Sequence, residues 1–551
     1  MSIVFSFITS GKYDKVSELF HSDPNSTTCK DEQDNLALHH LAYRNQQALV
    51  KFLISHGNDV TAVNQNGETA FHLACQSGSA YTVHILLNSI TSPNECLSCR
   101  DNMGRTPVHH AAYSGNPEML HYLYLNWGVD LNDRDIRSWN TLHICAALAH
   151  HRSILYLLRG EKVPLLSQTA QGDTALHLVL QKQSLLTVWY MVVTSGEIAH
   201  IPDQNGQTPL DILRKDERKS VRNFTPLIEA VIIKRTFATR PWHIWLLYFL
   251  GPIISYDLAL ISIYYIPYPY GYLFGFCTFL AGWLYFLSPH RLPHPTGWES
   301  PGSMGLLVLG ATHVGFSYLI LIAPYFYPYL FNTISLVSIF LFSIWLFFTA
   351  RGGAQVVKFG SENRENQRQK YTEKFPLHDE PSSYAKSLQF CHVCELLQCP
   401  RSKHCKLCDT CVLEFDHHCA WLNCCIGSGN HHRFFILMHF MSFTVLQYMA
   451  SVIAYWIDNC ETSNLLSLFL CASYYHRILL VLFICSGVCM VFLANAVFLQ
   501  WVYVSQMGTF YFRPISGFRL GYLTRFRNII LFLTDYQDWV QRREINQFRI
   551  L

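Results

Sequence analysis

The chain has 551 residues, of which 50% are hydrophobic and 14% are charged, and its net charge is +3. So few charged residues favour a membrane protein over a soluble one, and the small net charge excludes a global basic field that would attract nucleic acid. Nine of the 19 cysteines lie between Cys391 and Cys425, which favours metal binding over a disulfide framework. The first residues lack a basic region and a cleavage site, so we expect no cleaved signal peptide.

Self-similarity at a period of about 34 residues marks the N-terminal part of the chain. The clearest copies are NGETAFHLACQSG (66–78), MGRTPVHHAAYSG (103–115), SWNTLHICAALAH (138–150), QGDTALHLVLQ (171–181) and NGQTPLDIL (205–213), with a weaker copy at 34–45 and a degenerate opener near 4–29. Each copy resembles the ankyrin repeat. This resemblance predicts a mainly α-helical solenoid of about six repeats over residues 1–215, whose exposed face binds other proteins.

Glycine, threonine and histidine recur at fixed places in this frame. The glycine supplies a turn, and the threonine caps the helix that follows. The histidines are His72, His109, His143 and His177, and we expect them to be buried and hydrogen-bonded rather than to bind metal or act in catalysis. Trp127 and Trp139 lie near repeat edges, where two roles stay open: anchoring a partner, or packing between repeats.

The composition becomes strongly apolar after a linker at 216–243. Six stretches are long enough to cross a bilayer, which takes roughly 20 residues. They lie near 244–265, 269–288, 305–328 and 331–350, within a first membrane region at 244–350, and near 434–456 and 477–503, within a second at 434–503. The connections at 265–271, 324–329 and 458–464 carry no basic residue, whereas the other connections carry many. The positive-inside rule therefore places the N-terminal region, the insert 351–433 and the tail 504–551 in the cytosol.

Asp257 is an acidic residue inside the first predicted span. Acids within a membrane are costly, so they are candidates for a function by default. Nothing else in the sequence points to such a role for Asp257. We therefore expect it to pair with a polar group of another span.

The insert is rich in cysteine and histidine over its core, residues 390–435. It contains Cys391-x2-Cys394, His404-Cys405-x2-Cys408-x2-Cys411 and His417-His418-Cys419. Structural zinc takes four tetrahedral sulfur or nitrogen ligands, and pairs two residues apart present both sulfurs to one ion. Two zinc ions are the natural number, because a single site would leave too many thiols unused. The spacing alone leaves open which ligand binds which ion.

This core resembles the cysteine-rich domain of the DHHC protein S-acyltransferases, membrane enzymes that move a fatty acyl group from acyl-coenzyme A to cytosolic cysteines. The resemblance runs without a gap from Cys391 to Phe435 and includes Asp416-His417-His418-Cys419. It implies one zinc bound by Cys391, Cys394, His404 and Cys411, and another bound by Cys405, Cys408, His418 and Cys425. It also implies protein substrates recruited by the ankyrin repeats, long-chain acyl-coenzyme A such as palmitoyl-coenzyme A as co-substrate, and residence in the Golgi or another endomembrane.

Asp416, His417 and Cys419 remain as a reactive set once the zinc ligands are assigned in this way. Only a thiolate attacks well, so a thiol with an ordinary pKa needs an adjacent base. The resemblance implies that His417 removes the proton, that Asp416 orients His417, and that Cys419 attacks the thioester carbonyl. Trp421 would flank the bound acyl chain, with a packing role as the alternative.

The sequence departs from the family pattern at several places. Ala420 replaces the usual proline after the nucleophile, and Cys399 and Cys424 stand where other residue types are usual. We expect Cys424 to be an inert buried thiol rather than a spare ligand or nucleophile. The family's Asp-Pro-Gly motif is replaced at 351–353 and its Thr-Thr-x-Glu motif at 508–511. Asn528 stands in the place of the family's C-terminal asparagine motif.

Three rival functions compete with this interpretation. An ion channel is disfavoured because the connection between the last two spans has no evident pore helix or selectivity sequence. A zinc-finger nucleic-acid binder is disfavoured because the cysteine-rich core is short of basic residues and is tethered to membrane. A catalytically weak or inactive ankyrin-repeat scaffold stays open as the alternative. Asp416, His417 and Cys419 argue against it, because folding around zinc requires none of them.

Overall fold

The computed structural model describes residues 3–182, 184–218, 242–267, 269–282, 302–322, 347–351, 364–376, 388–399, 401–460, 464–506 and 522–534, with a few single residues and pairs between them. Its contacts divide the chain into two units. The first combines Met1–Thr239 with Lys358–Gln398, and the second combines Arg240–Val357 with Cys399–Leu551. A segment that follows the first predicted spans in sequence therefore packs with the N-terminal unit.

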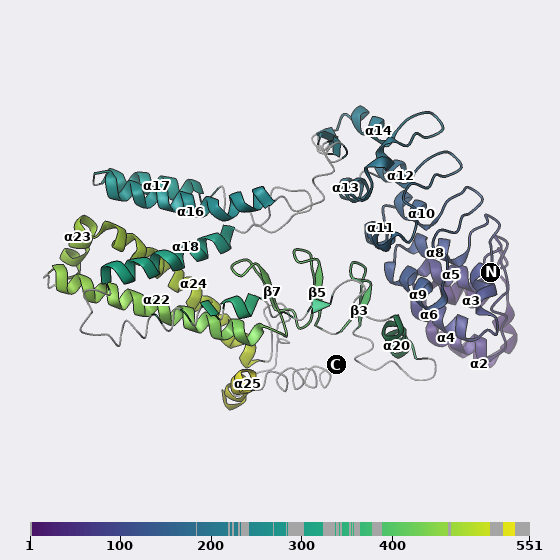
Figure 1. Cartoon of the computed structure of the whole chain (residues 1–551). Helices are drawn as coiled ribbons and strands as arrows, with labels where there is room; N and C mark the ends of the chain where they lie inside the picture. The colour runs from purple at the N-terminus through teal and green to yellow at the C-terminus, as the bar shows by residue number, and fades with distance from the viewer. Residues whose placement is uncertain are drawn as a thin grey trace. The chain divides into compact units, whose positions relative to one another are not determined.

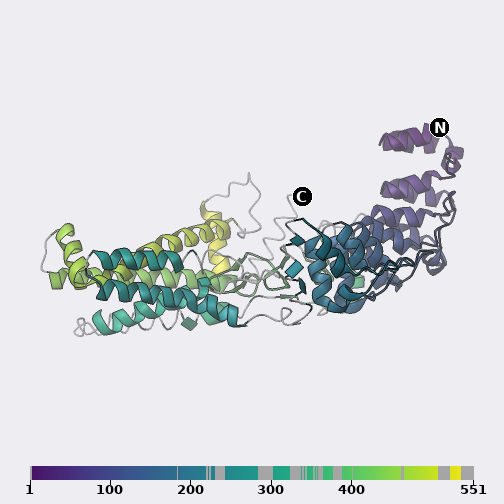
Figure 2. The same cartoon turned by 90° about the horizontal axis from the view of Figure 1, so that it is seen from above.

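Short helices in successive pairs build the first unit (Figures 1 and 2). They are α1 Ile3–Thr9, α2 Tyr13–Ser22, α3 Ala37–Tyr43, α4 Gln47–Ser55, α5 Ala70–Ser77, α6 Ala80–Asn88, α8 Pro107–Ser114, α9 Pro117–Trp127, α10 Thr141–Ala147, α11 His151–Leu158, α12 Ala175–Gln181, α13 Leu185–Thr194 and α14 Pro209–Lys215. The short helix α7 (Pro93–Ser98) and the 3-10 turns η1 (Pro24–Thr28), η2 (Arg159–Glu161) and η3 (Gly196–His200) join them. This row of helix pairs is the predicted solenoid, and the degenerate opener forms α1 and α2.

The repeated histidines join neighbouring repeats, as the sequence predicts. His72 Nδ1 accepts the Thr69 N–H at 3.1 Å at the start of α5, and His72 Nε2 donates to the Arg105 carbonyl of the next repeat at 3.2 Å. The same pair of bonds recurs at His109, His143 and His177. All four side chains are buried. The prediction of buried, hydrogen-bonded histidines is confirmed.

A glycine is required at the turn before α5. Gly67 has φ of 74°, and a Cβ added there would lie 2.7 Å from Asn102 Oδ1 of the following repeat. Both the left-handed backbone and the close approach exclude other side chains without strain. Trp127 and Trp139 pack against the core of this unit, as the packing alternative expects.

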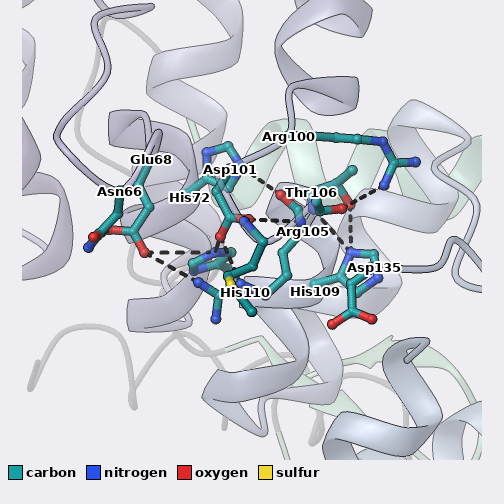
Figure 3. A network of polar contacts seen from close by, with 12 residues as sticks. Asn66, Glu68, His72, Arg100, Asp101, Arg105, Thr106, His109, His110 and Asp135 are labelled. Carbon is teal, nitrogen blue, oxygen red and sulfur yellow. Dashed lines mark hydrogen bonds and ion pairs between the residues drawn. The ribbon is translucent and has the colours of Figure 1, made fainter. Parts of the chain in front are cut away.

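A buried polar network lies between the first and second clear repeats (Figure 3). Asp101, which is 5% exposed, accepts hydrogen bonds from Arg105 Nε at 2.7 Å and from His110 Nε2 at 3.1 Å. Burial raises the pKa of Asp101, but the bonds from His110 and Arg105 outweigh it and hold the pKa far below its usual value. Glu68 also approaches Arg105. The Arg105 guanidinium pairs with Asp101 and lies within 4 Å of Glu68, so it offsets part of the buried negative charge.

The segment 358–398 contributes helix α20 (Arg364–Lys374) and the antiparallel strands β2 (Gln389–Cys391) and β3 (Leu396–Gln398) to the first unit. Tyr371, Phe375 and Leu397 are buried in the same core as the repeat helices. This packing is not predicted by the sequence pattern.

Helices dominate the second unit as well. They are α16 Trp242–Tyr265, α17 Tyr270–Gly282, α18 Gly302–Ser317 with a π-helical turn η6 Tyr318–Ile322, α22 His431–Cys460, α23 Leu465–Tyr475, α24 Arg477–Ser505 and α25 Tyr522–Thr534. Helices α16, α18, α22 and α24 run side by side (Figures 1 and 2). The protein as described is mainly α-helical.

Among the described residues, three helices are long and apolar enough to cross a membrane: Leu246–Tyr265, His431–Cys460 and Arg477–Ser505. They match the predicted spans at 244–265, 434–456 and 477–503. The predicted spans at 269–288 and 305–328 coincide in part with α17 and with α18 and η6. The predicted span at 331–350 falls mostly outside the described residues.

Two polar features of the second unit connect its helices. Asp257 Oδ1 in α16 lies 3.0 Å from His313 Nε2 in α18, so the expected partner of this acid is a histidine. A disulfide joins Cys460 at the end of α22 to Cys471 in α23. Neither this disulfide nor helix α23 was predicted from the sequence, because an apolar stretch of 11 residues is too short to be identified as a membrane span.

Short strands form the part of the second unit that follows the first spans. The strands β1 (Val356–Val357), β5 (Thr410–Val412) and β4 (Lys403–Cys405) form one antiparallel sheet in that order, and β6 (His417–Cys419) pairs with β7 (Cys424–Ile426). Figure 1 shows these strands as a series of hairpins. They present most of the predicted site residues.

Candidate active site and metal centres

The β6–β7 hairpin separates two sets of predicted site residues. Its register pairs His418 with Cys425 and Cys419 with Cys424. The loop between the strands turns at Asn423, which has φ of 50°, a conformation that asparagine tolerates well. Because side chains alternate along a strand, His417 and Cys419 lie on one face of β6 and His418 lies on the other. The predicted base and nucleophile thus share a face that excludes the predicted metal ligand.

One Cys/His group surrounds His418. Its Nδ1 lies 3.4 Å from the sulfurs of Cys405 and Cys408 and 3.5 Å from that of Cys425. The sulfurs of Cys408 and Cys425 are also 3.5 Å apart. A tetrahedral zinc ion with bonds of 2.0–2.3 Å would set its ligand atoms roughly 3.5 Å apart. The four residues therefore fit a zinc ion in both chemistry and spacing.

Cys391, Cys394, His404 and Cys411 make a second Cys/His group, in which the ligand atoms all lie within 4.8 Å of one another. His404 and Cys411 face each other across β4 and β5, with 3.9 Å between Nδ1 and Sγ. The Cys394 N–H donates to the Cys391 sulfur at 3.3 Å, as in a tight knuckle. His404 and Cys405 are adjacent in β4, so their side chains point to opposite faces and enter different groups. Strand alternation thus explains why the two sets interleave in sequence.

The predicted reactive set lies at the start of the hairpin. His417 Nδ1 donates to Asp416 Oδ2 at 2.7 Å, which leaves Nε2 as the nitrogen that can take a proton. Burial lowers the pKa of His417, but hydrogen bonds with Asp416 and Cys419 raise it more, to about 9. Asp416 is fully buried and Cys419 is 5% exposed. The imidazole is therefore a stronger base than an ordinary histidine, and it lies beside the thiol.

Two residues that were not predicted from the sequence, Gln500 and His431, form a hydrogen-bonded chain that ends on the Asp416 carboxylate. Gln500 Nε2 in α24 donates to Asp416 Oδ2 at 3.1 Å. Its Oε1 accepts a hydrogen bond from His431 Nε2 at 3.0 Å, and His431 is fully buried at the start of α22. A glutamine in a strongly apolar helix was the available signal, because polar groups are costly there.

Apolar side chains surround Cys419. It is buried in a cluster with Ala350, Leu422, Ile426, Phe434 and Leu437, the last two from the first turns of α22. The ring of Phe434 also lies edge-on to His417, with 5.2 Å between centroids. Trp421 is 46% exposed, so burial in a core is not its role. An apolar acyl chain would find compatible neighbours next to this thiol.

The positions that depart from the family pattern have varied surroundings. Cys424 is half-buried directly opposite Cys419 in the hairpin, so it is not fully buried as expected. Asn528 Nδ2 in α25 donates to the Ser505 carbonyl at 2.8 Å and closes the last turn of α24. Directly before the replaced motif at 351–353, the Ala350 carbonyl accepts a hydrogen bond from Asn430 Nδ2 at 2.7 Å. The replaced motif at 508–511 and residues 352–353 lie outside the described residues.

Comparisons with known proteins agree with both parts of the chain. Residues 384–513 match the model of the DHHC palmitoyltransferase family, and residues 6–95 and 38–135 match the model of ankyrin repeats in three copies. A solved structure, the human ASB11 ankyrin repeat domain, aligns at 19% identity over 41% of this chain and 98% of that chain, with a TM-score of 0.35.

Curated relatives share only part of their length with this chain. The mouse (Mus musculus) B-cell lymphoma 3 protein homolog is 30% identical over 166 residues, which cover 30% of this chain and 37% of that protein. The Drosophila melanogaster transient receptor potential cation channel subfamily A member 1 is 26% identical over 161 residues, 28% of this chain and 13% of that protein. With the repeats, the Cys/His groups and both family matches in place, the chain carries ankyrin repeats together with a domain of the DHHC palmitoyltransferase family, the family of protein S-palmitoyltransferases.

Proposed function

We propose that the chain is a protein S-palmitoyltransferase that carries the acyl group on Cys419 between acyl-coenzyme A and a cysteine of a substrate protein. The observation that carries this proposal is the arrangement on β6. His417 and Cys419 lie on one face of the strand, and Asp416 accepts the Nδ1 hydrogen of His417 at 2.7 Å. Folding around metal requires none of these three residues, so the arrangement also argues against the alternative of an inactive scaffold.

The reaction has two balanced stages. His417 Nε2 takes the thiol proton of Cys419, and the thiolate attacks the thioester carbonyl of acyl-coenzyme A. The carbon–sulfur bond to coenzyme A breaks, and the proton leaves with the coenzyme thiol. In the second stage a substrate thiol gives up its proton and replaces Cys419 in the same way, so that each stage exchanges one thioester for another. A positioned base of this kind is typically worth about 10² to 10⁴ in rate.

Asp416 and Gln500 have supporting roles. Asp416 fixes the His417 tautomer and stabilises the imidazolium, and Gln500 in turn fixes the carboxylate. Trp421 and the apolar cluster around Cys419 would flank the acyl chain. The two Cys/His groups would each hold a structural zinc ion, which would keep the short strands rigid enough to maintain base and nucleophile in register.

We propose six membrane spans, with the ankyrin repeats, the cysteine-rich insert and the C-terminal tail in the cytosol. Two observations support this orientation. Among the described residues, the cysteines of the insert form no disulfide, as in a reducing compartment, whereas Cys460 at the end of α22 and Cys471 in α23 are joined by one. Disulfides persist in oxidising compartments, so this connection would face the lumen of the Golgi or another endomembrane.

The domain order also resembles the DHHC subgroup typified by huntingtin-interacting protein 14, in which ankyrin repeats precede the spans. We propose accordingly that the ankyrin repeats recruit the substrate proteins. The boundaries that follow are 1–215 for the repeats, 216–243 for the linker, 244–350 and 434–503 for the spans, 351–433 for the insert, and 504–551 for the tail.

Autoacylation tests the proposal. The full chain in detergent is incubated with labelled palmitoyl-coenzyme A and then treated with hydroxylamine, which releases thioesters. We expect hydroxylamine-sensitive label on the wild type and on Cys424→Ser, and none on Cys419→Ser. A folded, zinc-loaded wild type that takes up no label would contradict the proposal and favour the scaffold.

A further inference from the structure

The second helices of three successive repeats form one continuous face in the first unit. Helix α6 contributes Tyr81 and His84 to it, and α9 contributes His121 and Tyr122. Helix α11 contributes Tyr156. We call this the α6–α9–α11 face. Aromatic rings supply large, stiff contact areas, so such a face suits recognition of another chain segment.

Helix α20 covers the α6 and α9 part of this face with one stripe of side chains, and Tyr156 of α11 contacts Phe390 of β2. Gln367 and Tyr371 in α20 and Phe375, directly after its last residue, follow at intervals of four residues and are 7%, 1% and 7% exposed. The Phe375 N–H still donates to the Tyr371 carbonyl at 2.9 Å, so Phe375 continues the helical spacing. Residues four apart lie on the same side of a helix, so these three side chains form one stripe. Most of the other residues of α20 are exposed and polar.

Each member of the stripe meets a partner on the α6–α9–α11 face. Gln367 Oε1 accepts a hydrogen bond from His121 Nε2 at 3.0 Å. The Tyr371 ring lies 5.4 Å from the Tyr122 ring. Phe375 stacks on Tyr81 with 5.4 Å between centroids. The contact is therefore built from specific pairs rather than from general apolar burial.

Polar contacts flank the stripe on both sides. Arg368 donates from Nε and Nη2 to the Leu125 carbonyl in the last turn of α9, at 3.1 and 2.8 Å. Lys374 Nζ lies 2.5 Å from Glu118 Oε1, an ion pair in which both side chains are mostly buried. The Tyr81 hydroxyl donates to the Pro376 carbonyl at 2.7 Å. These contacts fix the direction and register of α20 on the repeats.

The helical conformation of α20 depends on this contact. It has 11 residues and a highly polar composition. Isolated helices shorter than about 12–15 residues are marginal in water. A segment that is helical only when docked behaves as a ligand of the surface that orders it.

We propose that the α6–α9–α11 face is a docking site for a short helical segment, and that α20 holds this site as an internal ligand. The chemistry of α20 defines the outside partner that fits. It is a protein helix with an amide and two aromatic side chains four residues apart, one arginine next to the amide and one lysine next to the last aromatic. Such a partner binds to the α6–α9–α11 face only by displacing α20.

This inference goes beyond the proposed transferase activity and does not rest on it. It concerns which surface of the repeats is open to other proteins. The strand β2 follows α20 in the chain, and the β2–β3 turn is also attached to the repeats, because Arg159 Nη1 donates to the Val393 carbonyl at 2.8 Å and Lys162 pairs with Glu395. Displacement of α20 would leave this second attachment in place.

A labelled peptide that copies residues 362–378 tests the proposal on the full chain in detergent. Its affinity is measured by fluorescence anisotropy for the wild type and for the double variant Tyr371→Ser/Phe375→Ser, whose own α20 cannot dock. We expect at least roughly tenfold tighter binding to the variant, because apparent affinity falls with the fraction of sites that are free. Equal affinity for both proteins, or binding to neither, would overturn the proposal.

Two controls make this result specific. The peptide with the same two serine substitutions is expected not to bind either protein. The chain variant Asn366→Ser/Glu373→Ser changes two exposed residues of α20, and we expect it to bind the peptide as weakly as the wild type does. Tight binding to this control variant would show that loosening of α20 in general, rather than loss of the stripe, opens the site.

Reversal of the charges in the Glu118–Lys374 ion pair gives a second test that preserves the fold. Hydrogen exchange of the α20 amides is followed in the full chain. We expect protection in the wild type, loss of protection in Glu118→Lys, and recovery in the double variant Glu118→Lys/Lys374→Glu. If α20 stays protected in Glu118→Lys and in Tyr371→Ser/Phe375→Ser, docking is not what orders it, and the internal-ligand proposal is wrong.

Discussion

Histidines in the ankyrin unit and histidines in the cysteine-rich hairpin share a side chain but differ in their partners. In the repeats, His72 and His143 accept a backbone N–H with one nitrogen and donate to a backbone carbonyl with the other. Burial lowers the pKa of each to about 4, so the imidazoles stay neutral. His417 is also buried, but it faces a carboxylate and a thiol, and its pKa is raised to about 9.

The partners of a buried histidine, rather than its burial, therefore decide its role. Two backbone groups satisfy a neutral imidazole and make it a structural joint between repeats. A carboxylate favours the protonated form and makes the imidazole a base. His418, next to His417 in the chain, meets three cysteine sulfurs and has a third role, as a candidate metal ligand.

The largest effect is expected when the candidate metal ligand His418 is removed. We predict that His418→Ala lowers the bound zinc from two ions to one per chain and exposes the β6–β7 hairpin to proteolysis. Structural zinc sites contribute roughly 10–16 kcal/mol of binding energy to local folding. Metal analysis of the purified protein and limited proteolysis measure both effects. Retention of two zinc ions would remove His418 from the metal site.

Substitution of the adjacent histidine is expected to affect chemistry alone. We predict that His417→Gln keeps two zinc ions and an intact hairpin but slows acylation of Cys419 by about 10² to 10⁴, the usual contribution of a general base. The rate is followed with labelled palmitoyl-coenzyme A, and zinc content is measured on the same sample. An unchanged rate would mean that another group takes the thiol proton.

The neutral histidines of the repeats predict acid sensitivity of the first unit. His72 and His143 have an ordinary pKa of 6.5 when unfolded and about 4 when folded. Between these values the unfolded chain binds more protons, so stability falls as pH falls. At pH 5 this costs about 2 kcal/mol per histidine relative to neutral pH.

Thermal unfolding of the full chain at pH 7.5 and pH 5 checks this prediction. The matched control is His72→Gln, because glutamine at this position keeps the capping box but does not titrate. We expect the control to lose less stability at pH 5 than the wild type. The same loss in both proteins would assign the acid sensitivity to other groups.

The smallest effect is expected at Gln500. We predict that Gln500→Leu slows acylation about tenfold, since the loss of one hydrogen bond to a buried carboxylate costs about 1–2 kcal/mol. Asn495→Leu, which changes an exposed amide of the same helix, is expected to leave the rate unchanged. If both variants behave alike, polarity of α24 rather than support of Asp416 is responsible.

Much of the architecture could be predicted from the sequence because it follows local patterns. The ankyrin frame recurs at a fixed period, and the matching glycines and histidines have the conformations and bonds that the frame requires. The long apolar stretches at α16, α22 and α24 are equally direct signals. The membership of the two Cys/His groups came from the family resemblance, since the spacing alone left it open.

The missed features depend on contacts between residues far apart in the chain. Helix α20 and the residue after it have no apolar periodicity beyond Tyr371 and Phe375, so nothing local predicts that the helix packs on the repeats. Gln500 and His431 are 69 residues apart, and only the fold brings them together behind Asp416. The disulfide between Cys460 and Cys471 depends likewise on helix α23, which was not predicted.

The most direct measurement is to map the acyl group within the chain. The wild type is incubated with palmitoyl-coenzyme A and digested, and mass spectrometry locates the thioester. The face of β6 that Cys419 shares with His417 predicts that the acyl group is on Cys419. An acyl group on Cys424, which lies opposite it in the hairpin, or on another cysteine with Cys419 free, would contradict the assignment of Asp416, His417 and Cys419 as the reactive set.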